Sequence, residues 1–232
     1  NQCETSDWTD IVAIDAWGPG LTIGLKADGT VVYTGDYPYS QETYIHEVSS
    51  WKDIVAIRIL HSSIFGLKSD GTVAVARISE DGVDGSFFKD WSDIIAIYSA
   101  GIPWVEGTHY IGLKADGTVI GTDIKTVYNP DRTMTRTVIN SDLQRDISKW
   151  SDIIAVAASG NYIIGLKSDG TVVSAGQCDV ATIDTSAWSD IIMIYNSGIC
   201  AFGVKKDGSV IYSGKINNDP FLKHWNDIKL PN

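Results

Sequence analysis

Basic residues are scarce in this chain, and their scarcity excludes two classes of partner. The 232 residues include 18 Lys and Arg against 29 Asp and Glu, which gives a formal net charge of −11. A nucleic-acid-binding protein needs a basic surface to displace counterions from phosphates, and docking on an anionic membrane needs the same sign of charge. No run approaches the roughly 18 apolar residues of a spanning helix, so we also expect no membrane insertion.

Cysteine is rare, and the common motifs of hydrolases and metal enzymes are missing. Cys3, Cys178 and Cys200 have no Cys-x-x-Cys spacing, and neither His-Glu-x-x-His nor Gly-x-Ser-x-Gly occurs. A bridge from Cys3 to either other cysteine stays open, and Cys200 is expected to be a small buried side chain in an apolar strand. We therefore expect a non-enzymatic protein with no catalytic residues, no cofactor and no metal.

The sequence does contain an internal repeat. The phrase Trp-x-Asp-Ile begins at Trp8, Trp51, Trp91, Trp150 and Trp188, with a weaker sixth copy at Trp225. A second phrase, Gly-Leu-Lys-x-Asp-Gly-Thr-Val, follows these copies from Gly24, Gly66, Gly112, Gly165 and, in a degenerate form, Gly203. The repeat is about 38 residues long and covers residues 8–50, 51–90, 91–149, 150–187 and 188–224, with a closing segment at 225–232.

The pattern within each repeat predicts three β-strands. The apolar run after Trp-x-Asp, such as Ile11 to Ile14, is short and rich in β-branched residues, which favours a strand buried on both faces. The Asp-Gly pair favours a tight hairpin because Gly adopts positive φ without steric cost. The Asp of Trp-x-Asp-Ile is expected to cap the local turn. Helices should be few, since no segment shows a clear period of 3.6 residues.

Strand repeats of this length predict an all-β fold, namely a closed β-propeller with five blades, one per repeat, in a single domain over residues 1–232. A β-solenoid or an open array of hairpins is the alternative. The propeller is favoured because the apolar strands need neighbours on both faces and a ring leaves no long exposed edges. The repeated Trp residues are expected to be wedges between neighbouring blades. The Trp225 segment would complete the last blade or pair with the N-terminal region.

The two phrases together resemble the RCC1-like repeat in its bacterial form, best in the first, second and fourth repeats. The resemblance implies a closed propeller with a protein-binding ring face. The sequence departs from the family in having five full repeats and in rewriting the Ala-Ala-Gly segment after the inner strand. Members serve unrelated ends, so no single activity is implied. The bacterial members, and a chain that does not begin with Met, lead us to expect an extracellular or cell-surface bacterial protein.

We expect a non-catalytic binding module that recognises a protein through one propeller face. The alternative is a carbohydrate-binding, lectin-like propeller, but its repeats should share one polar and aromatic set, whereas these loops differ from repeat to repeat. The loops that join the first two strands supply the candidate residues Asp15, Trp17, Arg58, His61, Tyr98, Trp104, Glu106, Asn161, Tyr162, Tyr195 and Asn196. Trp17 and Trp104 are expected to be exposed anchors, since Trp is frequent in binding hot spots. For Tyr98 and Tyr195, covering the core is an equal alternative.

A long insertion separates Gly121 from Lys149. A turn-like stretch over residues 128–132 precedes residues 133–139, in which polar and apolar residues alternate as in a half-exposed strand. We expect a protruding hairpin or an extended outer strand on the third blade. The alternative is a flexible loop, which is common for connections of this length.

Overall fold

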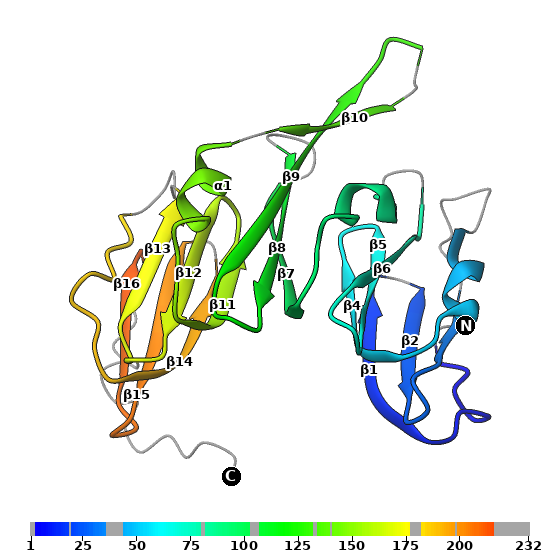
Figure 1. Ribbon diagram of the computed structural model, residues 1–232, viewed down its shortest axis with the longest axis horizontal. Helices are drawn as coiled ribbons and strands as arrows, with labels where there is room; N and C mark the ends of the chain where they lie inside the picture. The colour runs from blue at the N-terminus through cyan, green and yellow to red at the C-terminus, as the bar shows by residue number, and fades with distance from the viewer. Residues whose placement is uncertain are drawn as a thin grey trace. The chain divides into compact units, whose positions relative to one another are not determined.

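The described part of the chain is almost entirely β-structure. The computed structural model describes residues 3–18, 20–35, 44–79, 82–102, 107–131, 134–139, 141–176, 182–197 and 199–215. These residues form sixteen strands in five antiparallel sheets, one short α-helix and two 3-10 helices (Figure 1). The expected all-β class and scarcity of helices are confirmed for them. The chain divides into two compact units, Asn1–Ile97 and Tyr98–Asn232, and each is described by itself.

The first unit contains two three-stranded sheets whose strands follow sequence order. The first sheet comprises β1 (Ile11–Trp17), β2 (Leu21–Lys26) and β3 (Val31–Thr34). The second comprises β4 (Ile54–Leu60), β5 (Ser63–Lys68) and β6 (Val73–Arg77). The 3-10 helices, Tyr44–Ser50 and Gly85–Phe88, follow the first and second sheets in the sequence.

The third sheet differs from the others because it has four described strands. It comprises β7 (Ile94–Ile102), β8 (Gly107–Lys114), β9 (Val119–Tyr128) and β10 (Met134–Ile139), in the order β10-β9-β8-β7. Helix α1 (Asp142–Ile147) follows it. The fourth sheet comprises β11 (Ile153–Ser159), β12 (Tyr162–Lys167) and β13 (Val172–Gly176), and the fifth comprises β14 (Ile191–Asn196), β15 (Cys200–Lys205) and β16 (Val210–Gly214). Each sequence repeat thus forms one sheet.

The Asp-Gly hairpins predicted from the second phrase are confirmed. Gly29 has a φ of 80°, and the Asp28 carboxylate accepts bonds from the backbone N–H and the hydroxyl of Thr30 at 3.0 and 2.6 Å. These bonds lower the pKa of Asp28 below its ordinary value. The same turn and the same direction of pKa shift recur at Asp70, Asp116, Asp169 and Asp207.

The Asp of the first phrase acts through its backbone. Asp10, Asp53, Asp93, Asp152 and Asp190 all have φ values of 58–62°, in the left-handed region that Asp tolerates better than most residues. The carbonyl of Asp10 accepts the N–H of Ala27 at 2.8 Å, and the carbonyl of Asp53 accepts the N–H of Ser69 at 2.8 Å. The carbonyls of Asp152 and Asp190 accept corresponding bonds, so the start of the first strand is tied to the hairpin of the same sheet in these four repeats.

A hydrophobic core joins the first sheet to the second. Leu21, Ile23 and Leu25 from β2 share one buried cluster with Ile54 and Ile57 from β4. We call the face of a sheet that packs against the next repeat its trailing face. The register row on the trailing face of the first sheet is Asp15, Ile23 and Tyr33. A corresponding cluster in the second unit joins the trailing face of the fourth sheet to the fifth.

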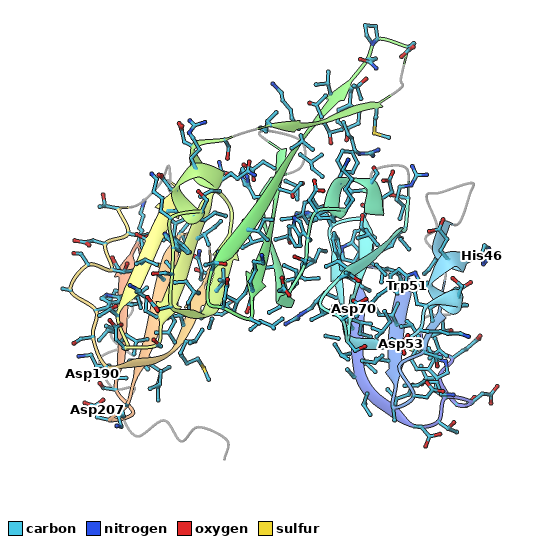
Figure 2. The ribbon with its side chains drawn as sticks, viewed as in Figure 1. His46, Trp51, Asp53, Asp70, Asp190 and Asp207 are labelled. Atoms are coloured by element: carbon cyan, nitrogen blue, oxygen red, sulfur yellow. The ribbon has the colours of Figure 1, made fainter. Side chains whose placement is uncertain are left out.

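The wedge position of the repeated Trp residues is confirmed for Trp51 (labelled in Figure 2) and Trp188. Trp51 packs against the core shared by the first two sheets, and Trp188 is part of the core shared by the fourth and fifth. Each indole lies on a Gly of its own sheet. A Cβ added at Gly66 would come within 2.8 Å of the Trp51 ring, and one at Gly203 within 3.0 Å of the Trp188 ring. Gly at these positions therefore makes room for the indole.

The expectation that the first strands are buried on both faces is wrong. Val12, Val55, Ile154 and Ile192 are 64%, 55%, 56% and 40% exposed. In each of these strands the pairing register shifts at this residue, as between Ile11 and Ala13. A β-bulge leaves its extra residue outside the regular ladder, so the second apolar residue of the phrase is left accessible to solvent.

The expectations for the three cysteines can be compared with the structure for Cys3 and Cys200. Cys200 is buried, as expected, and its thiol lies 2.9 Å from the carbonyl oxygen of Lys215. Cys3 is exposed, and no disulfide joins it to Cys200. Cys178 and the Trp225 segment lie outside the described residues, and so does the expected pairing of that segment.

Candidate functional site

Two of the candidate binding residues join neighbouring sheets instead of facing a partner. Asp15 accepts the backbone N–H of Ile59, in the next sheet, at 2.8 Å. Asn196 is 6% exposed, and its amide donates to the carbonyl of Tyr162, in the preceding sheet, at 2.7 Å. Their polar atoms hold adjacent inner strands together, and a binding role for either residue stays a prediction.

The candidates of the fourth repeat lie deeper than expected. Tyr162 begins β12 and is 4% exposed, with its hydroxyl donating to the carbonyl of Ile183 at 3.1 Å. Its ring is part of the core between the fourth and fifth sheets, and a role in binding stays a prediction. Asn161 is half-buried beside it.

Three further candidates are partly buried. Trp17, at the end of β1, packs against the core of the first unit and is not the exposed anchor that the sequence suggested. His61 occupies the turn between β4 and β5 with a φ of 52°, and burial lowers the pKa of its imidazole. Tyr98 in β7 is half-buried.

Arg58 and Tyr195 are the candidates that the structure leaves well exposed, Tyr195 at 63%. Trp104 and Glu106 lie outside the described residues. A role in binding stays a prediction for all eleven candidates.

A ribbon on the third sheet sets it apart from the other sheets, as far as they are described. β9 is ten residues long, whereas β3, β6, β13 and β16 have four or five. Ile124 pairs with Thr108 near the start of β8, and β9 then continues as residues 125–128 paired with β10. This ribbon, residues 124–131 and 134–139, projects from its sheet (Figure 1). The predicted protruding hairpin is therefore confirmed.

The ribbon leaves the sheet at the end where binding was predicted. Gly107 begins β8, directly after the connection between the first two strands of this sheet, and a Cβ there would lie 2.6 Å from the carbonyl oxygen of Ile124. The ribbon starts at Ile124. In the third sheet, the ribbon and the predicted binding loop therefore share one end.

A buried polar network fixes the base of the ribbon. His109 and Asp123 are 8% and 2% exposed, and the His109 Nδ1 lies 2.8 Å from the Asp123 Oδ1. The Ser141 hydroxyl donates to the other carboxylate oxygen and also caps α1 by accepting the N–H of Gln144 at 3.1 Å. The Gln144 side chain donates to the carbonyl of Gly121 at 2.7 Å. Strand β9 is thereby held to both β8 and α1.

Sequence reasoning missed this network. A His and an Asp interrupt otherwise apolar stretches of β8 and β9, which was a visible signal, but only the strand register shows that they face each other. The arrangement does not suit hydrolysis. The Asp123 carboxylate stands between imidazole and hydroxyl, whereas a hydrolytic triad places the imidazole in the middle.

The exposed surface of the ribbon is largely apolar. Val127, Tyr128 and Val138 are 44%, 55% and 56% exposed, and Lys125 is exposed beside them. Residues 124–139 contain three basic side chains and one acidic side chain, in a chain with a net charge of −11. β10 is the last strand of its sheet, so its outer edge offers backbone N–H and C=O groups to another strand.

Other kinds of site find little support in the described residues. Among them, no group of three His, Cys, Asp or Glu side chains is placed to hold a metal ion. None of the helices described is long and apolar enough to cross a membrane.

Comparison with known proteins identifies the fold. No protein-family model and no curated protein matches the chain. The crystal structure of Kap60 bound to yeast RCC1 (Prp20) matches at 12% identity with a TM-score of 0.50, covering 84% of this chain and 54% of that one. Human WBSCR16 matches at 14% identity with a TM-score of 0.49, covering 84% of this chain and 60% of that one. The yeast match shows an RCC1-like β-propeller fold, of which this chain spans about half the length.

Proposed function

We propose that this protein is a non-catalytic recognition module that binds a protein partner through one face of an RCC1-like propeller. The observation that carries the proposal is the ribbon, which extends the third sheet beyond its core at the end expected to bind. Its base is held by the His109–Asp123 pair, and its tip exposes Val127 and Tyr128. A rigid base reduces the entropy lost when a partner orders the ribbon.

A protein partner fits this surface better than a glycan. A lectin assembled from repeats should present one polar and aromatic set in every repeat, but the segments at the ends of the first strands differ. They read Asp15-Ala16-Trp17-Gly18 in the first repeat and Ala157-Ala158-Ser159-Gly160 in the fourth. The yeast RCC1 of the comparison was crystallised bound to the protein Kap60, which supports protein recognition by analogy.

The sequence also leads us to propose where the protein acts and how its domain is built. We propose that it acts outside a bacterial cell or at the cell surface. It is proposed to be a single domain whose blades are the five sheets, and closure of these five into a ring stays a prediction.

The proposal is tested by capturing partners from the native bacterium on the immobilised full-length chain, then measuring the affinity of the purified partner by calorimetry. Replacing residues 125–137 with a short Gly-Ser turn should abolish binding. Lys125→Glu should weaken it by at least about tenfold, as for a hot-spot contact.

Lys206→Glu is the matched control, because it reverses the charge of another exposed lysine in the same unit, in the turn between β15 and β16. Undiminished binding by the folded ribbon-less protein would overturn the proposal, as would recognition of glycans alone on an array.

A further inference from the structure

A repeated backbone hydrogen bond joins each sheet to the phrase that starts the next repeat. The Ile N–H of Trp-x-Asp-Ile donates to the Gly carbonyl of the preceding Asp-Gly turn. These bonds run from Ile54 to Gly29, Ile94 to Gly71, Ile153 to Gly117 and Ile191 to Gly170, at 3.0, 3.0, 2.9 and 3.0 Å. The contact is tight, since a Cβ at Gly29 would lie 3.2 Å from the Asp53 Cα. Each of these turns is thus an acceptor for the following phrase.

The fifth sheet presents the same acceptor turn. Gly208 has a φ of 83°, and its N–H donates to the carbonyl of Lys205 at 2.9 Å. The Asp207 carboxylate accepts from the N–H and hydroxyl of Ser209 at 2.9 and 2.6 Å, as in the earlier turns. Asp207 lies near Asp190 at one end of the sheet (Figure 2). The Gly208 carbonyl therefore belongs to a turn with the geometry that accepts an Ile N–H in the other four.

The trailing face of the fifth sheet is apolar, like the buried trailing faces of the first and fourth sheets, but its tyrosine side chains are exposed. Its row of Tyr195, Phe202 and Tyr212 has ring centroids 6.3 and 6.4 Å apart. Ile23 and Ile164, which correspond to Phe202, are 0% exposed beneath the next repeat. By contrast, Tyr195 and Tyr212 are 63% and 45% exposed. Three adjoining aromatic side chains on such a face call for an apolar partner.

The chain carries one more phrase of the kind that covers such a face. Trp225-Asn226-Asp227-Ile228 repeats Trp-x-Asp-Ile and lies outside the described residues. Ile228 follows Gly208 by 20 residues, close to the 21 residues between Gly170 and Ile191. The connecting chain is therefore about as long as one that already allows the bond.

We propose that the trailing face of the fifth sheet is the docking site of the Trp225 phrase. The Ile228 N–H donates to the Gly208 carbonyl, and the Trp225 indole covers the aromatic row. This phrase is favoured over the equivalent phrase at Trp8 because a short connection costs less loop-closure entropy than a long one. The trailing face of the fifth sheet has room for one such phrase. If the Trp225 phrase binds there, the Trp8 phrase cannot close a five-bladed ring by binding to the same face.

The test is a photo-crosslink in the full chain with benzoylphenylalanine in place of Tyr195. After irradiation and trypsin digestion, mass spectrometry should find position 195 joined to peptide 224–229 of the same chain. Adding Trp225→Ala should lower the yield by at least about tenfold, as for the loss of a hot-spot indole. Benzoylphenylalanine in place of Tyr128, which is 55% exposed in the same unit, is the matched control and should not label this peptide.

Each other result overturns the assignment. A crosslink to the peptide that contains Trp8 would show that the Trp8 phrase occupies this face and closes the ring. A crosslink between two chains would show that a second copy of the protein occupies it. An absence of any protein crosslink, together with glycan binding that Tyr195→Ala removes, would make the row a sugar platform. The crosslinking results do not bear on the ribbon, so the proposed function is tested separately by the ribbon-less protein and the glycan array.

Discussion

The first and fifth sheets share one pattern of strands and turns but differ in what lies against their trailing faces. In the first sheet, Ile23 is fully buried by the second sheet, and Asp15 accepts a backbone bond from it. In the fifth, the same row holds aromatic rings that are largely open. A repeat therefore specifies its own hairpins, whereas the burial of its faces depends on its neighbour.

The largest effect should come from emptying the covered face. Ile23→Ala removes a fully buried side chain and should lower the free energy of unfolding by about 2–5 kcal/mol. Denaturant unfolding followed by circular dichroism measures the change. Val12→Ala, on a side chain 64% exposed in the same sheet, should change it by no more than about 0.5 kcal/mol. Equal effects of the two changes would contradict the described packing.

A smaller loss is expected from crowding an indole. Gly66→Ala places a Cβ 2.8 Å from the Trp51 ring and should cost about 1–3 kcal/mol through overpacking. Gly85→Ala is the control, because a Cβ there meets no atom within 4 Å. The difference between the two melting temperatures gives the readout, and an unchanged value for Gly66→Ala would show that the indole lies elsewhere.

Corresponding residues of the two end sheets sharpen the comparison further. Asp15→Ala should cost about 1–2 kcal/mol because the buried N–H of Ile59 loses its acceptor. Asp15→Asn keeps an acceptor oxygen and should restore most of this loss. Tyr195→Ala, at the corresponding position of the fifth sheet, should cost more than about 0.5 kcal/mol, because the proposed docking of the Trp225 phrase covers this row. A smaller cost, measured by denaturant unfolding, would mean that the row is open.

The smallest expected effect is on the loss of folding stability at acidic pH. The pKa of Asp70 is lowered by the Thr72 hydroxyl and N–H, so its ionised form is favoured in the folded state. This stability is present above the pKa of the unfolded chain and is lost as pH falls through the folded value, below about pH 4. Thr72→Val removes the hydroxyl and should flatten this part of the pH–stability curve slightly, as seen by thermal melts between about pH 2 and 6. If stability falls with pH at the same slope in both proteins, the Asp70 turn does not contribute to the acid sensitivity.

Sequence reasoning captured what is local and repeated. Asp-Gly predicted the hairpins, and the repeated Trp was expected to be a wedge between neighbouring sheets, as Trp51 is. The insertion after Gly121 was recognised as a hairpin from the alternation in residues 133–139. These features depend on backbone preferences and on short-range pattern.

The candidate site was predicted less well because its residues depend on register between sheets. Asp15, Tyr162 and Asn196 looked like loop residues free to bind, but each forms a bond with a segment 21 to 44 residues away. The exposed bulge at Val12 was missed because an apolar run does not show where its ladder skips a residue. The pairing of His109 with Asp123 likewise appears only when β8 and β9 are aligned.

The four bonds from Ile to the preceding Gly also set an order of events for a chain that emerges N-terminus first. Each acceptor turn is complete before its donor is synthesised, so every finished sheet can serve as a template for the strand that follows. Growth by addition to a formed edge avoids a search among distant segments. The hairpin around Gly29 is in this sense the template for the phrase that begins at Trp51.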